Sequence, residues 1–77
     1  MSFTMYTTEN CVYCQKTKTL LTDWNQEYVN VILDSKEKIN EFKKNTGLKT
    51  VPQIYHDSGI HIGGYDDLLH YLLNREK

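Results

Sequence analysis

The chain has few cysteines, the residues whose disulfides often stabilise proteins too small for a large hydrophobic core. It has 77 residues, with only two cysteines and one proline. The cysteines, Cys11 and Cys14, stand three positions apart, so a disulfide between them closes a loop too short to remove much denatured-state entropy. A disulfide between them would therefore add little to the stability of the fold, which favours a chemical role for the pair.

Large charge imbalance and long apolar runs are also missing. The formal net charge is −1, and acidic and basic residues are interspersed, which argues against a nucleic-acid partner. No apolar stretch approaches the roughly 20 residues that span a bilayer, and the N-terminal residues lack the pattern of a secretory signal. We therefore expect a cytoplasmic protein without a membrane partner. In that compartment close cysteine pairs are more often catalytic or metal-binding than structural.

Short apolar runs alternate with helical patterns along the chain, and its length predicts a single domain over residues 1–77. Strands are expected at residues 3–6, 28–33, 53–56 and 60–62, and helices at about residues 11–26, 36–45 and 66–75. Asn10 is the expected N-cap of the first helix, Asp34 or Ser35 that of the second, and Gly47 the stop of the second. The order β-α-β-α-β-β-α predicts an α/β fold with a four-stranded mixed sheet and three flanking helices.

The cysteine pair falls at the junction between the first strand and the first helix. The thiolate is the nucleophilic form of cysteine, and its free pKa of about 8.5 is lowered at a helix N-terminus by unpaired N–H groups and the helix dipole. Cys11 would lie at that end and attack a substrate disulfide. Cys14, one turn further along on the inward face, would resolve the mixed disulfide.

A zinc site is the alternative use of two close cysteines. Tetrahedral zinc needs four ligands, and the remaining nitrogen candidates are His56, His61 and His70, which stand far from the pair in the sequence. We expect no metal, and we expect the three histidines to be surface or hairpin residues.

Three segments together resemble the glutaredoxin family, which has the thioredoxin fold. They are CVYC at residues 11–14, TVPQIY at residues 50–55 and GGYDDL at residues 63–68. The resemblance covers nearly the whole chain, because the order and spacing of the elements also fit. It implies glutathione as co-substrate, with a site made by Tyr13, Lys49, Thr50, Val51, Pro52, Gly64, Tyr65, Asp66 and Asp67.

Within that implied site, the Val51–Pro52 bond is expected to be cis, leaving the backbone of Val51 to pair with an extended tripeptide. Gly64, Tyr65 and Asp66 would hold the γ-glutamyl end. Asp66 or Asp67 would meet its ammonium group, although an aspartate at a helix start is often only a cap, and this competes most directly for Asp67. Tyr13 would line the groove with its ring.

Two positions depart from the family pattern. Val12 stands where many members have proline, which restores a backbone N–H at the helix start and should shift the redox potential. Thr8 stands where a lysine is often found three residues before the first cysteine. Lys49, or else Lys16, could supply the missing cation.

The resemblance thus implies a monomeric dithiol glutaredoxin that reduces protein disulfides and glutathione mixed disulfides, with ribonucleotide reductase as a client class. Two alternatives stay open. One is a redoxin of the same fold that thioredoxin reductase reduces, which Thr8 favours slightly. The other is a carrier that holds an iron–sulfur cluster between two protomers.

Overall fold

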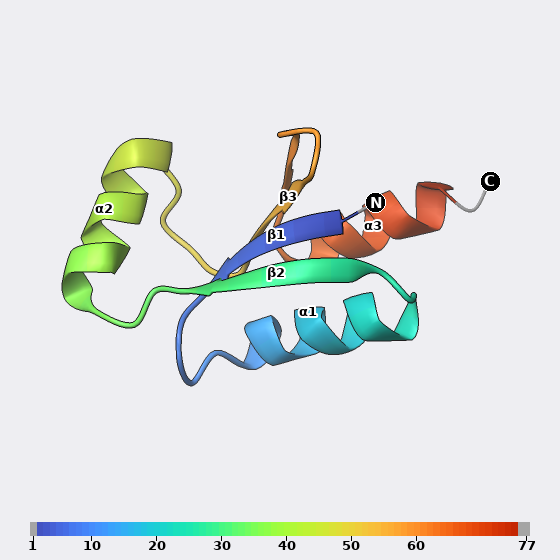
Figure 1. Ribbon diagram of the computed structural model, residues 1–77, viewed down its shortest axis with the longest axis horizontal. Coiled ribbons are helices and arrows are strands. Elements are labelled where there is room, and N and C mark those ends of the chain that lie inside the picture. Colours follow the sequence, from blue (N-terminus) through green and yellow to red (C-terminus); the bar gives the residue numbers. More distant parts are fainter. Residues whose placement is uncertain (1, 76–77) are drawn as a thin grey trace.

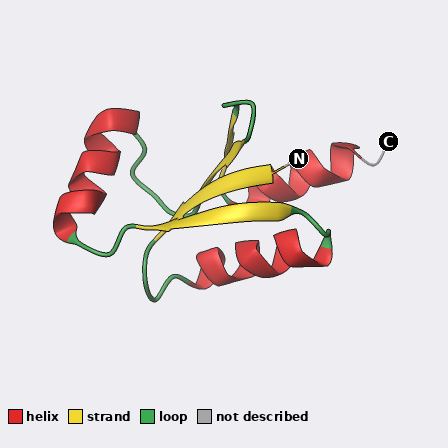
Figure 2. Ribbon diagram, viewed as in Figure 1, coloured by secondary structure: helices red, strands yellow, loops and turns green. Residues whose placement is uncertain are grey.

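The computed structural model describes residues 2–75 and contains one four-stranded sheet and three helices (Figures 1 and 2). In chain order the elements are β1 (Ser2–Thr7), α1 (Val12–Asp23), β2 (Glu27–Ile32), α2 (Lys36–Thr46), β3 (Gln53–His56), β4 (His61–Gly63) and α3 (Tyr65–Arg75). This order confirms the predicted fold class. No helix within residues 2–75 is long and apolar enough to cross a membrane.

The strands lie side by side in the order β2-β1-β3-β4. The crossover helix α1 joins β1 to β2, which run parallel, while β3 is antiparallel to both β1 and β4. A right-handed crossover through a helix is the usual way to join two parallel neighbours. The mixed sheet therefore follows from the chain order, as predicted.

The core lies on one face of the sheet. Strand β1 alternates, and its residues Phe3 and Met5 are fully buried. They pack with the buried side chains of β3, α1 and α3, which are Ile54, Leu21, Leu68 and Leu72. Helices α1 and α3 thus cover the same face and bury the apolar stripe that their sequence spacing predicts.

Helix α2 lies on the other face and stands apart from α1 and α3 in Figure 1. Phe42 is its buried side chain, and the Phe42 ring lies 4.9 Å from the Tyr6 ring of β1, centroid to centroid. Because successive strand residues point to opposite faces, Tyr6 faces α2 while Phe3 and Met5 face the core.

The helix ends correct two sequence predictions. Asn10 is not the N-cap of α1: it has a left-handed φ of 58°, and Cys11 is the N-cap instead. Helix α1 ends at Asp23 rather than near residue 26, because Trp24 closes it and Asn25 turns the chain with a φ of 56°. For α2, Ser35 is the N-cap and Gly47 the left-handed C-cap, as predicted.

The second strand of the hairpin, β4, lies one residue later than predicted, while β3 has the predicted bounds. Ile60 belongs to the turn, where its carbonyl accepts a hydrogen bond from His56 N–H at 2.9 Å. Strand β4 therefore includes Gly63, one residue beyond the predicted strand. Gly63 has a φ of 124°, a conformation that favours glycine.

Candidate active site

Cys11 and Cys14 lie at the carboxyl end of β1, where the chain turns into α1. They form a disulfide with their Cα atoms 5.2 Å apart. Cys14 is buried, with 1% of its surface exposed, while Cys11 is half-buried. This difference in access is the one that the sequence predicted.

The Cys11 side chain is itself the cap of the helix. Its sulfur accepts a hydrogen bond from Cys14 N–H at 3.1 Å, and its carbonyl accepts one from Gln15 N–H at 3.2 Å. Sulfur is a weak acceptor when neutral and a much better one as thiolate. In the reduced protein this N–H group and the helix dipole would therefore stabilise the thiolate form of Cys11.

A cavity of 210 Å³ brings together three segments that are distant in the sequence. Eight predicted site residues line it: Tyr13, Thr50, Val51, Pro52, Gly64, Tyr65, Asp66 and Asp67. The Val51 carbonyl oxygen lies 4.0 Å from the Cys11 sulfur, so this wall of the cavity adjoins the disulfide. The Val51–Pro52 bond is cis, as predicted.

Two tyrosine rings and a lysine lie in this region, Tyr13 and Lys16 on α1 and Tyr65 at the start of α3. The rings of Tyr13 and Tyr65 lie 6.1 Å apart at 49°, and Tyr13 is 55% exposed. The Lys16 ammonium lies 5.0 Å from the centre of the Tyr13 ring, within the range of a cation–π contact. Lys49, the other candidate cation, is exposed and is not among the described residues that line the cavity.

Asp67 makes the capping contact that competes with a ligand role. Its carboxylate accepts a hydrogen bond from Gly64 N–H at 3.2 Å, while Leu68 N–H donates to the Gly64 carbonyl at 3.0 Å. This is the reach-back half of a capping box at the start of α3. Asp66 is exposed beside it on the cavity wall.

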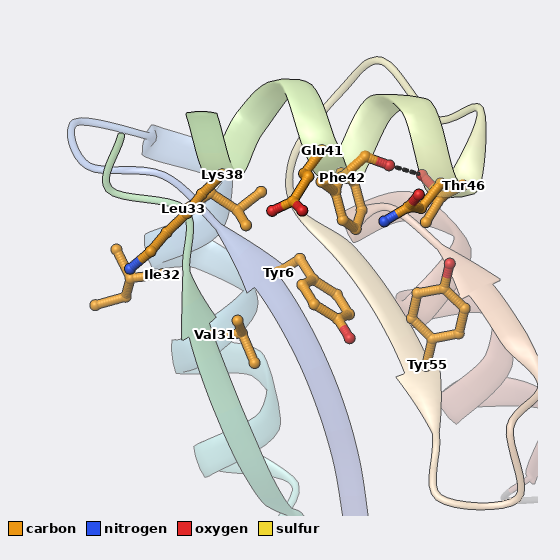
Figure 3. Close-up of a pocket in the computed structure, with 10 residues that line it drawn as sticks. Tyr6, Val31, Ile32, Leu33, Lys38, Glu41, Phe42, Thr46 and Tyr55 are labelled. Atoms are coloured by element: carbon orange, nitrogen blue, oxygen red, sulfur yellow. Dashed lines mark hydrogen bonds between the residues drawn. The ribbon is translucent and has the colours of Figure 1, made fainter. Parts of the chain in front are cut away.

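A second cavity, of 380 Å³, lies between α2 and the sheet (Figure 3). Figure 3 shows the rings of Tyr6, Phe42 and Tyr55 around it, with Glu41 pointing inward from α2. Sequence reasoning missed this cavity, although Tyr6 and Tyr55 alternate with the buried Met5 and Ile54. Its lining holds neither a cysteine nor a predicted site residue, so it is not the candidate active site.

Sequence reasoning also missed the contacts of Gln53 and His61. The Gln53 side chain is hydrogen-bonded to Thr50 on one side and to His61 on the other. A polar residue between Pro52 and the apolar Ile54 was the sequence signal that could have pointed to these contacts. Within residues 2–75, no group of three or more His, Cys, Asp or Glu side chains is arranged to hold a metal ion.

Comparisons with known proteins agree with this geometry. The family model for glutaredoxin matches residues 3–62. Glutaredoxin 1 of Rickettsia felis is 43% identical over 67 residues, which cover 83% of this chain and 65% of the Rickettsia protein. The chain therefore spans about two thirds of the length of that relative.

Two solved structures share the fold over nearly the whole chain. Glutaredoxin 1 from Francisella tularensis, complexed with cacodylate, superposes with a TM-score of 0.80 at 28% identity and covers 95% of this chain and 96% of its own. The buckwheat glutaredoxin–glutathione complex superposes with a TM-score of 0.78 at 25% identity and covers 94% of this chain and 68% of its own. With the family model and the Rickettsia relative, they show that this chain belongs to the glutaredoxin family.

Proposed function

We propose that the protein is a glutathione-dependent oxidoreductase that reduces glutathione mixed disulfides and protein disulfides. The observation that carries this is the cavity beside Cys11, which gathers eight residues of the three segments expected to hold glutathione. A similar fold that binds glutathione, the buckwheat complex, supports it. Ribonucleotide reductase remains the proposed client class. The further proposals are a cytoplasmic location, a monomer and a single domain over residues 1–77.

In the proposed mechanism the Cys11 thiolate attacks the glutathione sulfur of a mixed disulfide. The client leaves as a thiolate and takes up a proton, and Cys11 now carries glutathione. A second glutathione thiolate attacks this glutathione sulfur, which restores the Cys11 thiolate and releases glutathione disulfide. Atoms and electrons balance, because one glutathione arrives in the mixed disulfide and one as a thiol, and the two leave as glutathione disulfide while the client leaves as a thiol.

With a protein disulfide as substrate, Cys14 completes the reaction. Cys11 forms a mixed disulfide with the client, and the Cys14 thiolate attacks the Cys11 sulfur and releases the client dithiol. The product is the Cys11–Cys14 disulfide, the state seen in this structure. Two glutathione molecules then reduce it. The burial of Cys14 favours this order, because a client disulfide reaches the half-buried Cys11 first.

For glutathione itself, the cavity offers matching chemistry. An extended tripeptide can pair with the backbone groups of Val51, which lies just outside β3, as an added strand does. The start of α3 presents N–H groups that suit a carboxylate, and Asp66 suits an ammonium group.

The test is turnover of the mixed disulfide of glutathione and 2-mercaptoethanol, with reductants supplied separately. One assay couples glutathione to glutathione reductase, and the other couples the protein directly to thioredoxin reductase. We expect turnover in the first assay, and loss of it to the uncatalysed background in Cys11→Ser. Turnover with thioredoxin reductase alone would contradict glutathione dependence and support the redoxin alternative. A brown protein on anaerobic purification would support the cluster carrier instead.

A further inference from the structure

We propose that Gln53 is a positioning residue for the candidate glutathione site, acting through Thr50. The proposal rests on the proposed function and adds a residue that does not itself line the cavity. Gln53 opens β3 directly after Pro52 and is 6% exposed. A buried amide needs partners for its donors and its acceptor, and Gln53 has them on both sides.

The first contact ties Gln53 to the cavity wall. Its Nε2 donates to the Thr50 carbonyl oxygen and to Thr50 Oγ1, both at 3.1 Å. Thr50 lies in the loop between Gly47 and β3 and lines the cavity. The Gln53 side chain therefore spans three residues backward and fixes the backbone and hydroxyl of Thr50 together.

The second contact fixes which way the Gln53 amide points. The Thr50 carbonyl can only accept, so the amide NH₂ group must face Thr50 and the amide oxygen must face away. That oxygen lies 2.8 Å from Nε2 of His61 on β4, and Nε2 must therefore carry a proton. The His61 ring is held in turn against the Tyr55 ring, 4.8 Å between centroids.

This chain of bonds has a consequence for the Thr50 hydroxyl. A threonine hydroxyl has one proton to donate and two lone pairs to accept. Because Oγ1 accepts from Gln53, its own proton is left to donate elsewhere, and Thr50 faces the cavity. The arrangement would present an O–H donor to an acceptor group of glutathione, such as a peptide carbonyl or a carboxylate.

The variants separate the Gln53–Thr50 contact from the Gln53–His61 contact. Gln53→Met keeps the side-chain length but has neither donor nor acceptor. Gln53→Glu keeps the acceptor facing His61 and replaces the donors by a carboxylate oxygen. His61→Leu removes only the outer contact. Gln26→Met is the matched control, because Gln26 Nε2 makes a similar bond to the Trp24 carbonyl at 3.1 Å, outside the cavity lining.

The readout is the steady-state KM and kcat for the mixed disulfide of glutathione and 2-mercaptoethanol, with thermal unfolding to confirm that each variant is folded. We expect KM to rise about five- to tenfold in Gln53→Met and at least as much in Gln53→Glu, with kcat changed less than about twofold. His61→Leu should raise KM about twofold, and Gln26→Met should leave it unchanged.

A double-mutant cycle with Thr50→Val tests whether Gln53 acts through Thr50. If it does, Gln53→Met should raise KM much less in the Thr50→Val background than alone. Fully additive effects, or an unchanged KM in Gln53→Met while wild type turns over, would overturn the inference and leave the proposed function intact. A wild type without glutathione-dependent turnover would overturn the proposed function, and with it this role for Gln53.

Discussion

At the scale of single residues, Cys11 combines two tasks in one sulfur atom. It caps α1 by accepting the Cys14 N–H, and it is the more exposed member of the cysteine pair. If Asn10 were the N-cap, its amide would occupy the capping position and Cys11 would be the first residue of the helix. The cap at Cys11 thus gives the proposed nucleophile a hydrogen-bond donor from the backbone, which matters because Thr8 is not a cation.

Gly63 and Gly64 form a matched pair for a test at this scale. Gly63 has a φ of 124°, and a Cβ there would lie 2.8 Å from Asp67 Cγ. Gly64 has more space, because its Cβ would meet the Pro52 carbonyl oxygen at 3.6 Å, an ordinary contact. We expect Gly63→Ala to lower the free energy of unfolding by about 1–3 kcal/mol, because of the backbone strain and the displaced Asp67 cap.

Urea unfolding of both variants checks this expectation. Gly64→Ala should unfold within about 0.5 kcal/mol of wild type, as substitutions without a strained contact usually do. Equal losses in the two variants would show that the Gly63 conformation is not what stabilises this turn.

At the scale of elements, α2 differs from the other two helices in how it is attached. Helices α1 and α3 share the core with Phe3, Met5 and Ile54. Helix α2 has capping at both ends but one buried side chain, Phe42, and the cavity of Figure 3 lies along its inner face. Its attachment to the sheet therefore depends on the Phe42 ring and its contact with Tyr6.

Phe42→Ala should lower the free energy of unfolding by about 3 kcal/mol, near the lower end for a buried phenylalanine, because the ring borders an existing cavity. It should also speed amide hydrogen exchange in α2 more than in α1 or α3. Leu73→Ala is the control, since Leu73 is a 48% exposed residue of α3, and its loss should stay within about 0.5 kcal/mol. Exchange that rises equally in all three helices would contradict a separate attachment of α2.

At the scale of the whole molecule, local patterns were enough to predict the order of the elements and the mixed sheet. Alternation in β1 and helical spacing in α1 and α3 reflect burial on one face, and burial is what a sequence pattern records most directly. The three motif segments contain the described residues that line the cavity beside Cys11, whereas Lys49, which was predicted with them, does not line it.

The features that sequence reasoning missed depend on choices between similar residues or on distant contacts. Asn10 and Cys11 are both able to cap a helix, and the left-handed turn at Asn10 decides between them. The bond from Gln53 to His61 joins two strands across a hairpin, and a one-residue shift of β4 sets which side chains meet. The cavity under α2 reflects a packing gap, which residue types alone do not reveal.

The central claim is that Cys11 is the nucleophile and that glutathione is its partner. The most direct measurement is mass spectrometry of reduced Cys14→Ser and reduced Cys11→Ser after exposure to glutathione disulfide. We expect Cys14→Ser to gain one glutathione, mapped to Cys11, with release of one glutathione thiolate. Cys11→Ser should gain glutathione much more slowly, because Cys14 is buried. An adduct that forms as fast on Cys14, or no adduct on Cys11, would contradict the claim.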